Sequence, residues 1–488
     1  MSRTRTLRRS GLILLSGGLL LTACSAPTAS DAGGVVSTSS SPPPSSSPVT
    51  SPSSEVAGPT PTPAAPSTTA PSSPAATSDA AAPTSAPSPP GSSTAAPAAD
   101  APVPPGGPVT AADMAAAAAL VDAMDVSRQA GAVIMASSAD AVGTDLVSAL
   151  GLGGVILMGS RGVVDGTDSG TPAQVAAVTA ALQQQSPDLP VLIATDQEYG
   201  DVQRLVNGFT DFPGASELAA VSDTAEAAAL TEQAAAAAGA EMRAVGITVD
   251  FAPDADIVPD RSSSAIGDRS FGADPERVAA LVVAAVRGYQ SAGVAATVKH
   301  FPGIGAIAAD THEELPTVTT SCTEWNDGAA VPFRQAVDAG VALVMTGHVL
   351  QPAIGVDRLP TSLSREALTD LLRGPGVGGC EPLSFTGIAV SDALEMAPVA
   401  DAYSSAEAGW RALAAGQDLL LMPVDPVAAH GGIVTAVGDG SLDPARLREA
   451  AVRVTALRIA ATRTPTPGLD VVGSAAHQAI ADRARSAG

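Results

Sequence analysis

The chain has 488 residues, of which 25 are lysine or arginine and 49 are aspartate or glutamate, so its formal net charge is −24. A chain this acidic is a poor candidate for binding nucleic acid or anionic lipid surfaces, because those partners carry charge of the same sign. We therefore expect no nucleic-acid partner.

Residues 1–24 have the three parts of an export signal. Four arginines precede an apolar run at 11–21, which is too short to be a stable transmembrane helix on its own. The run ends in Leu-Thr-Ala-Cys, which resembles a bacterial lipobox. The resemblance implies cleavage before Cys24 and lipid attachment to its sulfur, on the outer face of a bacterial cell membrane. The alternative is an ordinary signal peptide with an incidental cysteine.

Residues 25–108 consist almost entirely of serine, proline, alanine, threonine and glycine. They offer few apolar side chains to bury, and their prolines prevent helices, so we predict a disordered, semi-extended linker. Such a linker would hold a domain away from the membrane.

Residues 109–488 contain eight short apolar runs, each followed by a loop and then by a helical stretch. The runs are Gly131–Ala136, Gly154–Gly159, Val191–Asp196, Ile247–Pro253, Val294–Phe301, Ala342–Val349, Gly387–Ala393 and Asp418–Pro423. Continuous apolar runs are typical of strands buried on both faces of a parallel sheet. Eight strand–helix units predict an α/β fold, a single (β/α)8 TIM-type barrel. A doubly wound open sheet is the alternative, but it would not need eight units.

Polar residues fall at or near the carboxyl ends of these runs; they are Asp196, Asp250, Lys299, His300, His348 and Asp392. In a (β/α)8 barrel those ends converge on one mouth, where active sites are built. The segment 298–316 adds to this pattern. It holds the only lysine of the sequence, Lys299, next to His300, and it places Asp310 two residues before His312. A carboxylate could orient an imidazole there, although a surface loop with scattered polar groups is the alternative.

Five stretches together resemble glycoside hydrolase family 3, and within it the single-domain β-N-acetylhexosaminidases. They are Asp196–Glu198 through Arg204, Phe251–Pro253 with Asp256, Ile266–Pro275, Lys299–Gly305 with Asp310–His312, and Ser391–Met396. The resemblance covers essentially everything after the linker. Two departures affect substrate preference: Tyr199 and Asp201 stand where the family usually has glycine and arginine, and Ile304 stands where it commonly has histidine.

The resemblance implies a retaining mechanism, in which one group protonates the leaving oxygen and a carboxylate attacks from the opposite face. Asp392 matches the nucleophile, although it could instead cap the following helix. His312 matches an unusual histidine acid/base, oriented by Asp310; both could be ordinary loop residues. Sugar-binding positions fall on Asp196, Arg204, Arg269, Lys299 and His300, with structural salt bridges as the alternative for the two arginines. His348 stays outside the catalytic set, because a core histidine explains it equally well.

The predicted function is exo-hydrolysis of terminal β-linked N-acetylglucosamine from cell-wall muropeptides or chitin fragments, by a monomer that needs no cofactor. A β-glucosidase, a phosphorylase of the same family and an inactive sugar-binding barrel remain open. The spacings of known metal motifs are missing from the sequence, so we predict no metal site. After Cys24 only Cys322 and Cys380 remain, and in an exported protein they most simply form one disulfide. Two buried free thiols are the alternative.

Overall fold

The computed structural model describes residues 107–158 and 170–488. The predicted signal peptide and nearly all of the predicted linker lie outside the described residues. Within them, eight parallel strands form one sheet in the order β7-β6-β5-β4-β3-β2-β1-β8. The strands are β1 (Ile134–Ser137), β2 (Gly154–Ile156), β3 (Leu192–Thr195), β4 (Val249–Asp250), β5 (Ala295–Phe301), β6 (Leu343–Thr346), β7 (Ile388–Ser391) and β8 (Leu420–Leu421). A parallel bridge between Val390 and Leu419 links the two ends of this order, so the sheet nearly closes into a barrel.

Each predicted apolar run overlaps one of these strands, and every strand residue is buried. The predicted (β/α)8 barrel is therefore confirmed, and the open sheet is excluded. The first run was placed too early, because Gly131 and Ala132 belong to the helix α2 (Val126–Ala132) instead. A Cβ atom on Gly131 would overlap the carbonyl oxygen of Leu150. The apolar character at Gly131 thus reflects close packing of a helix rather than a strand.

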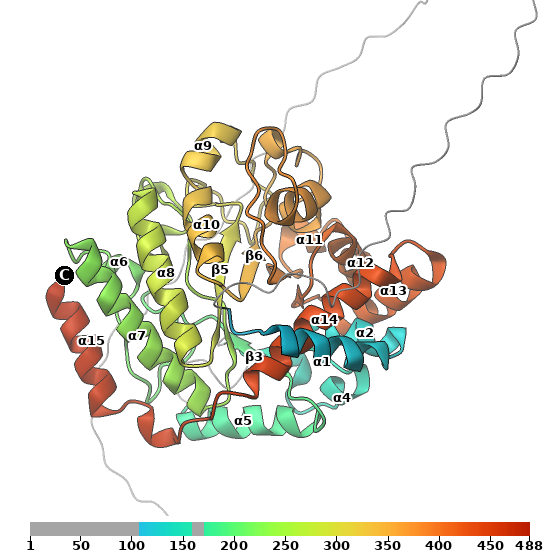
Figure 1. The fold of residues 1–488 in the computed structure, drawn as a ribbon, viewed down its shortest axis with the longest axis horizontal. Helices are drawn as coiled ribbons and strands as arrows, with labels where there is room; N and C mark the ends of the chain where they lie inside the picture. The colour runs from blue at the N-terminus through green and yellow to red at the C-terminus, as the bar shows by residue number, and fades with distance from the viewer. Residues whose placement is uncertain (1–106, 159–169) are drawn as a thin grey trace, which may run out of the picture. The chain divides into compact units, whose positions relative to one another are not determined.

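Helices surround the barrel (Figure 1). They are α1 (Ala111–Asp122), α2, α3 (Ser138–Ala141), α4 (Leu146–Leu150), α5 (Pro172–Gln184), α6 (Ala215–Leu218), α7 (Thr224–Ala244), α8 (Pro275–Ser291), α9 (Cys322–Asp327), α10 (Ala330–Asp338), α11 (Ala397–Ala400), α12 (Ser405–Ala415), α13 (Pro426–Asp439), α14 (Pro444–Ala461) and α15 (Ala475–Ala487). Figure 1 shows α7 beside α8, and α15 against α7. No helix among the described residues is long and apolar enough to cross a membrane.

The connection between β6 and β7 departs from the predicted strand–helix alternation. It contains two short 3₁₀ helices, η5 (Pro352–Ile354) and η6 (Thr361–Leu363), and a π-helical segment, η7 (Glu366–Arg373). Four side chains of η7 are buried, so this segment covers the barrel as an α-helix does elsewhere.

The loop between β5 and α9 is tied down at its stem. Trp325 donates a hydrogen bond from Nε1 to the carbonyl oxygen of Pro302, at 2.8 Å, which links the two ends of the loop. Cys322 and Cys380 are joined by a disulfide, with their Cα atoms 4.5 Å apart. This bond connects the start of α9 to the segment that precedes β7. The loop that carries His312 therefore leaves and rejoins the barrel at fixed points.

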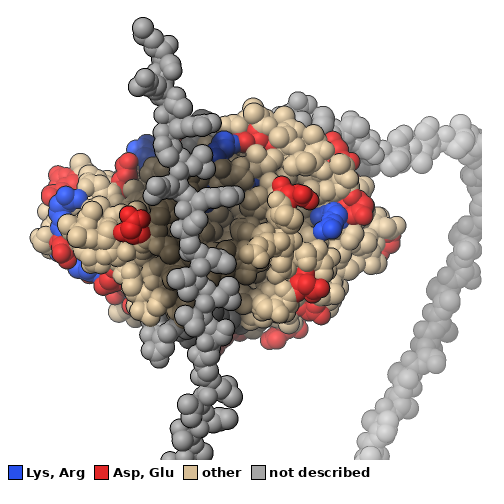
Figure 2. All heavy atoms as spheres, turned by 90° about the horizontal axis from the view of Figure 1, so that it is seen from below, with Lys and Arg blue, Asp and Glu red and all other residues tan. Residues whose placement is uncertain are grey.

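On the face shown in Figure 2, acidic side chains are spread over the surface among uncharged ones. The lysine and arginine side chains that are visible there form no continuous patch over the described residues. The absence of a nucleic-acid partner remains a prediction from the net charge.

Candidate active site

A pocket with a volume of about 190 Å³ opens at the carboxyl ends of the strands. All eight residues that the sequence predicted as catalytic or sugar-binding line this pocket. They are Asp196, Arg204, Arg269, Lys299, His300, Asp310, His312 and Asp392. Folding thus gathers residues that are nearly 200 positions apart in the chain into one cavity.

Lys299 stands at the centre of a buried ion-pair group. Its Nζ lies 2.5 Å from Glu198 Oε1 and 3.3 Å from Asp196 Oδ1, and only 3% of its side chain is exposed. Burial lowers the pKa of Lys299, but the charges of Glu198 and Asp196 outweigh burial, so the net shift is upward. Burial likewise raises the pKa of Glu198, yet Lys299 and Arg269 bring it down to about 2. Both groups are therefore held in their charged forms.

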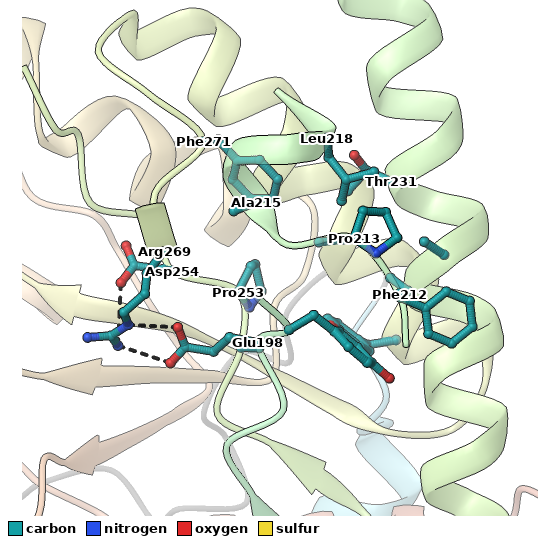
Figure 3. Close-up of a pocket in the computed structure, with 16 residues that line it drawn as sticks. Glu198, Phe212, Pro213, Ala215, Leu218, Thr231, Pro253, Asp254, Arg269 and Phe271 are labelled. Carbon is teal, nitrogen blue, oxygen red and sulfur yellow. Dashed lines mark hydrogen bonds and ion pairs between the residues drawn. The ribbon is translucent and has the colours of Figure 1, made fainter. Parts of the chain in front are cut away.

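Arg269 belongs to the same ion-pair group as Lys299 and Glu198. Its Nε and Nη2 donate to the two carboxylate oxygens of Glu198 at 2.8 and 3.0 Å, a bidentate pair. Its Nη2 also lies 3.6 Å from Asp254 Oδ2. Figure 3 shows the guanidinium between the two carboxylates, and behind Glu198 an apolar cavity lined by residues such as Phe212 and Phe271. Glu198 and Arg269 thus separate the polar pocket from that cavity.

His300 is held by the buried carboxylate of Asp256. The Asp256 Oδ2 atom lies 2.8 Å from His300 Nδ1, and its Oδ1 accepts from the backbone N–H of Ile304 at 2.6 Å. On the other side of the ring, His300 Nε2 lies 3.4 Å from Arg269 Nη2, so both ring nitrogens have a partner while the side chain lines the pocket. A Cβ on Gly305 would overlap the carbonyl oxygen of Ile257, so the loop needs glycine there to lie this close to β4.

Asp254, Asp256 and His300 are also the one described group whose ligand atoms lie close enough together to hold a metal ion, within 4.8 Å of one another. The oxygens of Asp256 already accept hydrogen bonds, and Arg269 places a cation 3.6 Å from Asp254. A second cation would meet the guanidinium charge at short range. We therefore assign this group to the orientation of His300, and the absence of a metal remains a prediction.

Asp392 follows β7 directly and presents a charged carboxylate to the pocket. Its N–H donates to the carbonyl oxygen of Thr346 at 2.9 Å, and its Oδ1 accepts from the N–H of Ala393 at 2.8 Å. Burial raises the pKa of Asp392, but His300, His348, the Ala393 N–H and Lys299 together lower it below the ordinary value. The next helix, α11, begins after Met396 as its N-cap, so Asp392 does not cap a helix. That alternative is excluded.

His312 and Asp310 lie together on the β5–α9 loop. Asp310 Oδ1 accepts from the backbone N–H of His312 at 2.9 Å and lies 2.7 Å from its Nδ1. The backbone hydrogen bond and the imidazole both lower the pKa of Asp310. With Nδ1–H donated to Asp310, Nε2 is left to exchange a proton. The His312 side chain is 69% exposed, and its backbone carbonyl accepts from the N–H of Ala397. The pair therefore stands at the rim, on the same side as the segment that follows Asp392.

Residues 125–457 match the model of the glycosyl hydrolase family 3 N terminal domain. The match covers more than half of the chain. The chain belongs to glycoside hydrolase family 3.

Relatives within family 3 share the fold and a large part of the sequence. A beta-hexosaminidase of Pseudomonas aeruginosa is 40% identical over 262 residues, which are 53% of this chain and 73% of that protein. The solved structure of a family 3 beta-N-acetylglucosaminidase from Paenibacillus sp. str. FPU-7 is 36% identical with a TM-score of 0.66, over 74% of this chain and 68% of that one. A beta-N-acetylhexosaminidase structure from Beutenbergia cavernae is 31% identical with a TM-score of 0.60, over 69% of this chain and 98% of that one.

The three residues that depart from the usual family 3 pattern occupy different places. Tyr199 turns away from the pocket and lines the apolar cavity, where its ring meets Phe212 edge-on at 5.4 Å. Its φ of 65° lies in the left-handed region, which glycine adopts more readily. Asp201 is exposed and does not line the pocket. Ile304 does line it, so of the three only Ile304 changes the surface that a family 3 substrate would meet.

Sequence reasoning did not assign a role to several residues that build the site. Glu198 and Asp256 stand in stretches that carried the resemblance to family 3, and Asp254 lies between Pro253 and Asp256, so that resemblance is the signal by which they could have been found. Their roles depend on Lys299 and Arg269, which come from other parts of the chain. Glu395 also lines the pocket, three residues after Asp392.

Proposed function

We propose that this family 3 protein is a β-N-acetylhexosaminidase, a retaining hydrolase that removes terminal β-linked N-acetylglucosamine. The observation that carries the proposal is that Asp392 and the His312–Asp310 pair line one pocket together with the five predicted sugar-binding residues. The relatives whose names describe this activity support the substrate class. The assignment of individual catalytic roles to this chain is ours.

In the first step a carboxylate oxygen of Asp392 attacks the anomeric carbon, and the bond from that carbon to the leaving oxygen breaks. His312, protonated at Nε2, gives its proton to the leaving oxygen, so the aglycone departs as a neutral alcohol. The low pKa of Asp392 keeps the nucleophile ionised for this step. The negative charge of Asp310 stabilises the imidazolium before the proton leaves.

In the second step, water attacks the anomeric carbon of the glycosyl-enzyme. His312, now neutral, takes a proton from that water, and the bond between the sugar and Asp392 breaks. The carboxylate of Asp392 and the imidazolium of His312 are both restored. Net retention of configuration follows, because the anomeric carbon is inverted twice.

The buried ion-pair group would hold the sugar ring. Lys299 and Arg204 donate to hydroxyl or acetamido oxygens, and Asp196, whose side chain is 15% exposed, accepts from a hydroxyl. His300 would contact the sugar from a fixed position, because Asp256 holds its Nδ1 and Arg269 lies 3.4 Å from its Nε2. Arg269 holds Glu198 in place through their bidentate pair, and it also lines the pocket.

We further propose that the enzyme works outside the cell membrane, held by a lipid on Cys24, and acts on cell-wall muropeptides or chitin-type fragments. This part rests on the sequence of residues 1–108 alone. Metabolic labelling with a fatty-acid probe, compared between the wild type and Cys24→Ala, tests it. Labelling of both proteins, or of neither, would contradict the anchor.

A chromogenic N-acetyl-β-glucosaminide tests the reaction class. We expect release of the chromophore in phosphate-free buffer and retention of anomeric configuration by NMR. A strict requirement for phosphate would identify a phosphorylase instead, and a preference for the matching glucoside would identify a β-glucosidase. Tight binding of the sugar without turnover would identify an inactive barrel.

A fluorinated N-acetylglucosamine analogue with a good leaving group tests the nucleophile. It should form a glycosyl-enzyme that breaks down slowly, and peptide mapping should place the sugar on Asp392. A label on any other carboxylate would overturn the assignment.

His312→Ala should separate the acid/base role from simple binding. General acid catalysis contributes on the order of 10²–10⁴-fold, so we expect a kcat loss of that size on a disaccharide, whose leaving group needs a proton. With a dinitrophenyl leaving group, which needs little protonation, the loss of the glycosylation rate should be below about tenfold. Equal losses on both substrates would remove His312 from this role. Asp310→Asn is the matched variant and should show the same pattern at smaller amplitude.

A further inference from the structure

His348 is fully buried beside the proposed nucleophile, two residues after β6. Its Nδ1 lies 2.7 Å from the hydroxyl oxygen of Ser362, and its Nε2 lies 3.0 Å from the carbonyl oxygen of Ala393. Ala393 is the residue that follows Asp392. Both ring nitrogens are thus used, and one of them contacts the backbone next to the reacting carboxylate.

These contacts define the tautomer of His348. A carbonyl oxygen can only accept, so the hydrogen must be on Nε2, which donates to Ala393. Nδ1 then accepts from the Ser362 hydroxyl in the neutral ring. Burial lowers the pKa of His348, which agrees with a ring that stays neutral.

Ser362 is itself held in place by Gln417, which lies just before β8. Gln417 donates from Nε2 to the carbonyl oxygen of Ser362 at 3.3 Å and to Thr346 Oγ1 at 2.5 Å. All four residues, from Gln417 to His348, are buried. The imidazole therefore cannot shift without breaking a chain of buried hydrogen bonds, each of which would leave an unpaired polar group.

The backbone after Asp392 is held by both β6 and β8. The Asp392 N–H donates to Thr346, the Ala393 carbonyl accepts from His348, and the Leu394 N–H donates to the carbonyl oxygen of Leu421 at 2.9 Å. The Ala393 N–H donates to the Asp392 carboxylate at 2.8 Å. The position of Ala393 therefore sets the direction of one carboxylate oxygen of Asp392.

We propose that His348 is a positioning residue for the nucleophile: its neutral ring holds the Ala393 carbonyl and so aims the Asp392 carboxylate at the anomeric carbon. The inference rests on the nucleophilic role proposed above for Asp392. It assigns a function to a histidine that the sequence pattern explains equally well as core. Misplacing a reacting group by about 1 Å costs on the order of 100-fold in rate, so such a role is measurable.

Two near-isosteric variants separate positioning from packing. The amide nitrogen of His348→Gln can reach the place of Nε2 and keep the donor to Ala393, whereas His348→Asn reaches only the place of Nδ1. We would measure the rate at which the fluorinated analogue labels Asp392, the analogue concentration for half-maximal rate, and the melting temperature. His348→Asn should slow labelling about 30-fold with little change in the half-maximal concentration, while His348→Gln should stay within about fivefold.

His477→Asn is the matched control. His477 on α15 also uses Nδ1, which lies 2.8 Å from Glu241 Oε1, and it does not line the pocket. This variant keeps a donor at the place of Nδ1 but loses the ring that lies beside Phe212, so it should lower the melting temperature and leave the labelling rate unchanged. Ser362→Ala keeps the imidazole but removes its Nδ1 partner, and it should slow labelling about threefold to tenfold if the inference is right.

Equal labelling rates for His348→Asn and His348→Gln, or an unchanged rate in His348→Asn, would overturn the inference while leaving Asp392 as the nucleophile. If His348→Asn does not fold, Ser362→Ala decides the question, and an unchanged rate there is the contrary result. A wild-type label on a residue other than Asp392 would overturn the proposed function as well, so the two failures are distinguishable.

Discussion

Two buried groups of charges occupy opposite ends of the same barrel. The pocket cluster lies at the carboxyl ends of the strands and consists of Asp196, Glu198, Arg269 and Lys299. The closed cluster lies before β8 and consists of Arg373, Asp418, Arg446 and Arg453. In each cluster burial raises the pKa of the central carboxylate, and neighbouring cations then lower it to about 2. By pKa alone the two clusters look the same.

What differs is how much bonding capacity each cluster leaves for a ligand. The oxygens of Asp418 receive donors from all three arginines and from the N–H of Ala389, so they are fully used. In the pocket cluster, Asp196 has Lys299 at 3.3 Å and Arg204 only at 3.8 Å, and it stays partly exposed. In this protein, a carboxylate with a shifted pKa therefore marks a binding site only where a pocket and unused hydrogen-bond acceptors lie beside it.

The largest expected effect comes from replacing Asp392, the proposed nucleophile, in the pocket. Asp392→Asn should lower kcat by at least about 10³-fold, because the amide cannot form the glycosyl-enzyme. Its melting temperature should stay close to that of the wild type, since the amide can still accept from Ala393. Steady-state kinetics with the chromogenic substrate and a thermal scan measure both quantities. More than a tenth of wild-type kcat would contradict the assignment.

Asp418→Asn should show the opposite balance. It leaves Arg373 without its carboxylate partner, while Arg446 and Arg453 keep Glu449. Removing one partner of such a buried ion-pair network costs about 3–5 kcal/mol of unfolding free energy. The kcat of the folded protein should be nearly unchanged, because the closed cluster is at the other end of the barrel. Chemical denaturation followed by circular dichroism measures the loss. A fall in kcat with normal stability would show that the closed cluster contributes to catalysis, as the pocket cluster is expected to do.

Glu198→Gln lies between these two extremes. Lys299 and Arg269 would keep Asp196 and Asp254 as partners, so we expect a loss of only about 1–3 kcal/mol in stability. Loss of the bidentate pair should displace both cations and lower kcat/KM about 100-fold. A variant with lower stability but normal kcat/KM would show that Glu198 only supports the fold.

The smallest effect concerns acid stability. The pKa of Glu198 falls from 4.5 to about 2 on folding, so its stabilising contribution is complete above the ordinary value and is lost as the pH falls towards 2. Between pH 5 and pH 3 this one group should cost about 2 kcal/mol of unfolding free energy. The pH dependence of denaturation should therefore be shallower in Glu198→Gln than in the wild type. Identical slopes would show that Glu198 is not ionised in the folded protein.

The sequence was sufficient to predict the barrel, because strands that are buried on both faces leave continuous apolar runs that can be counted. It was also sufficient to predict that Asp392 and His312 lie at the same end of the barrel, because the carboxyl ends of barrel strands converge. The closed cluster could not be foreseen, since Asp418 meets arginines from positions 373, 446 and 453 only after folding. Nor could the direction of Tyr199, which depends on the local backbone after β3.

The bond between Cys322 and Cys380 has a practical consequence for anyone who purifies this enzyme. Cys322 ends the loop that carries His312, the proposed proton donor, and Cys380 lies twelve residues before Asp392, the proposed nucleophile. A preparation made in a reducing host, or stored with dithiothreitol, is a different molecular species from one that carries the disulfide. Rates obtained from the two preparations should be compared only after free thiols have been titrated.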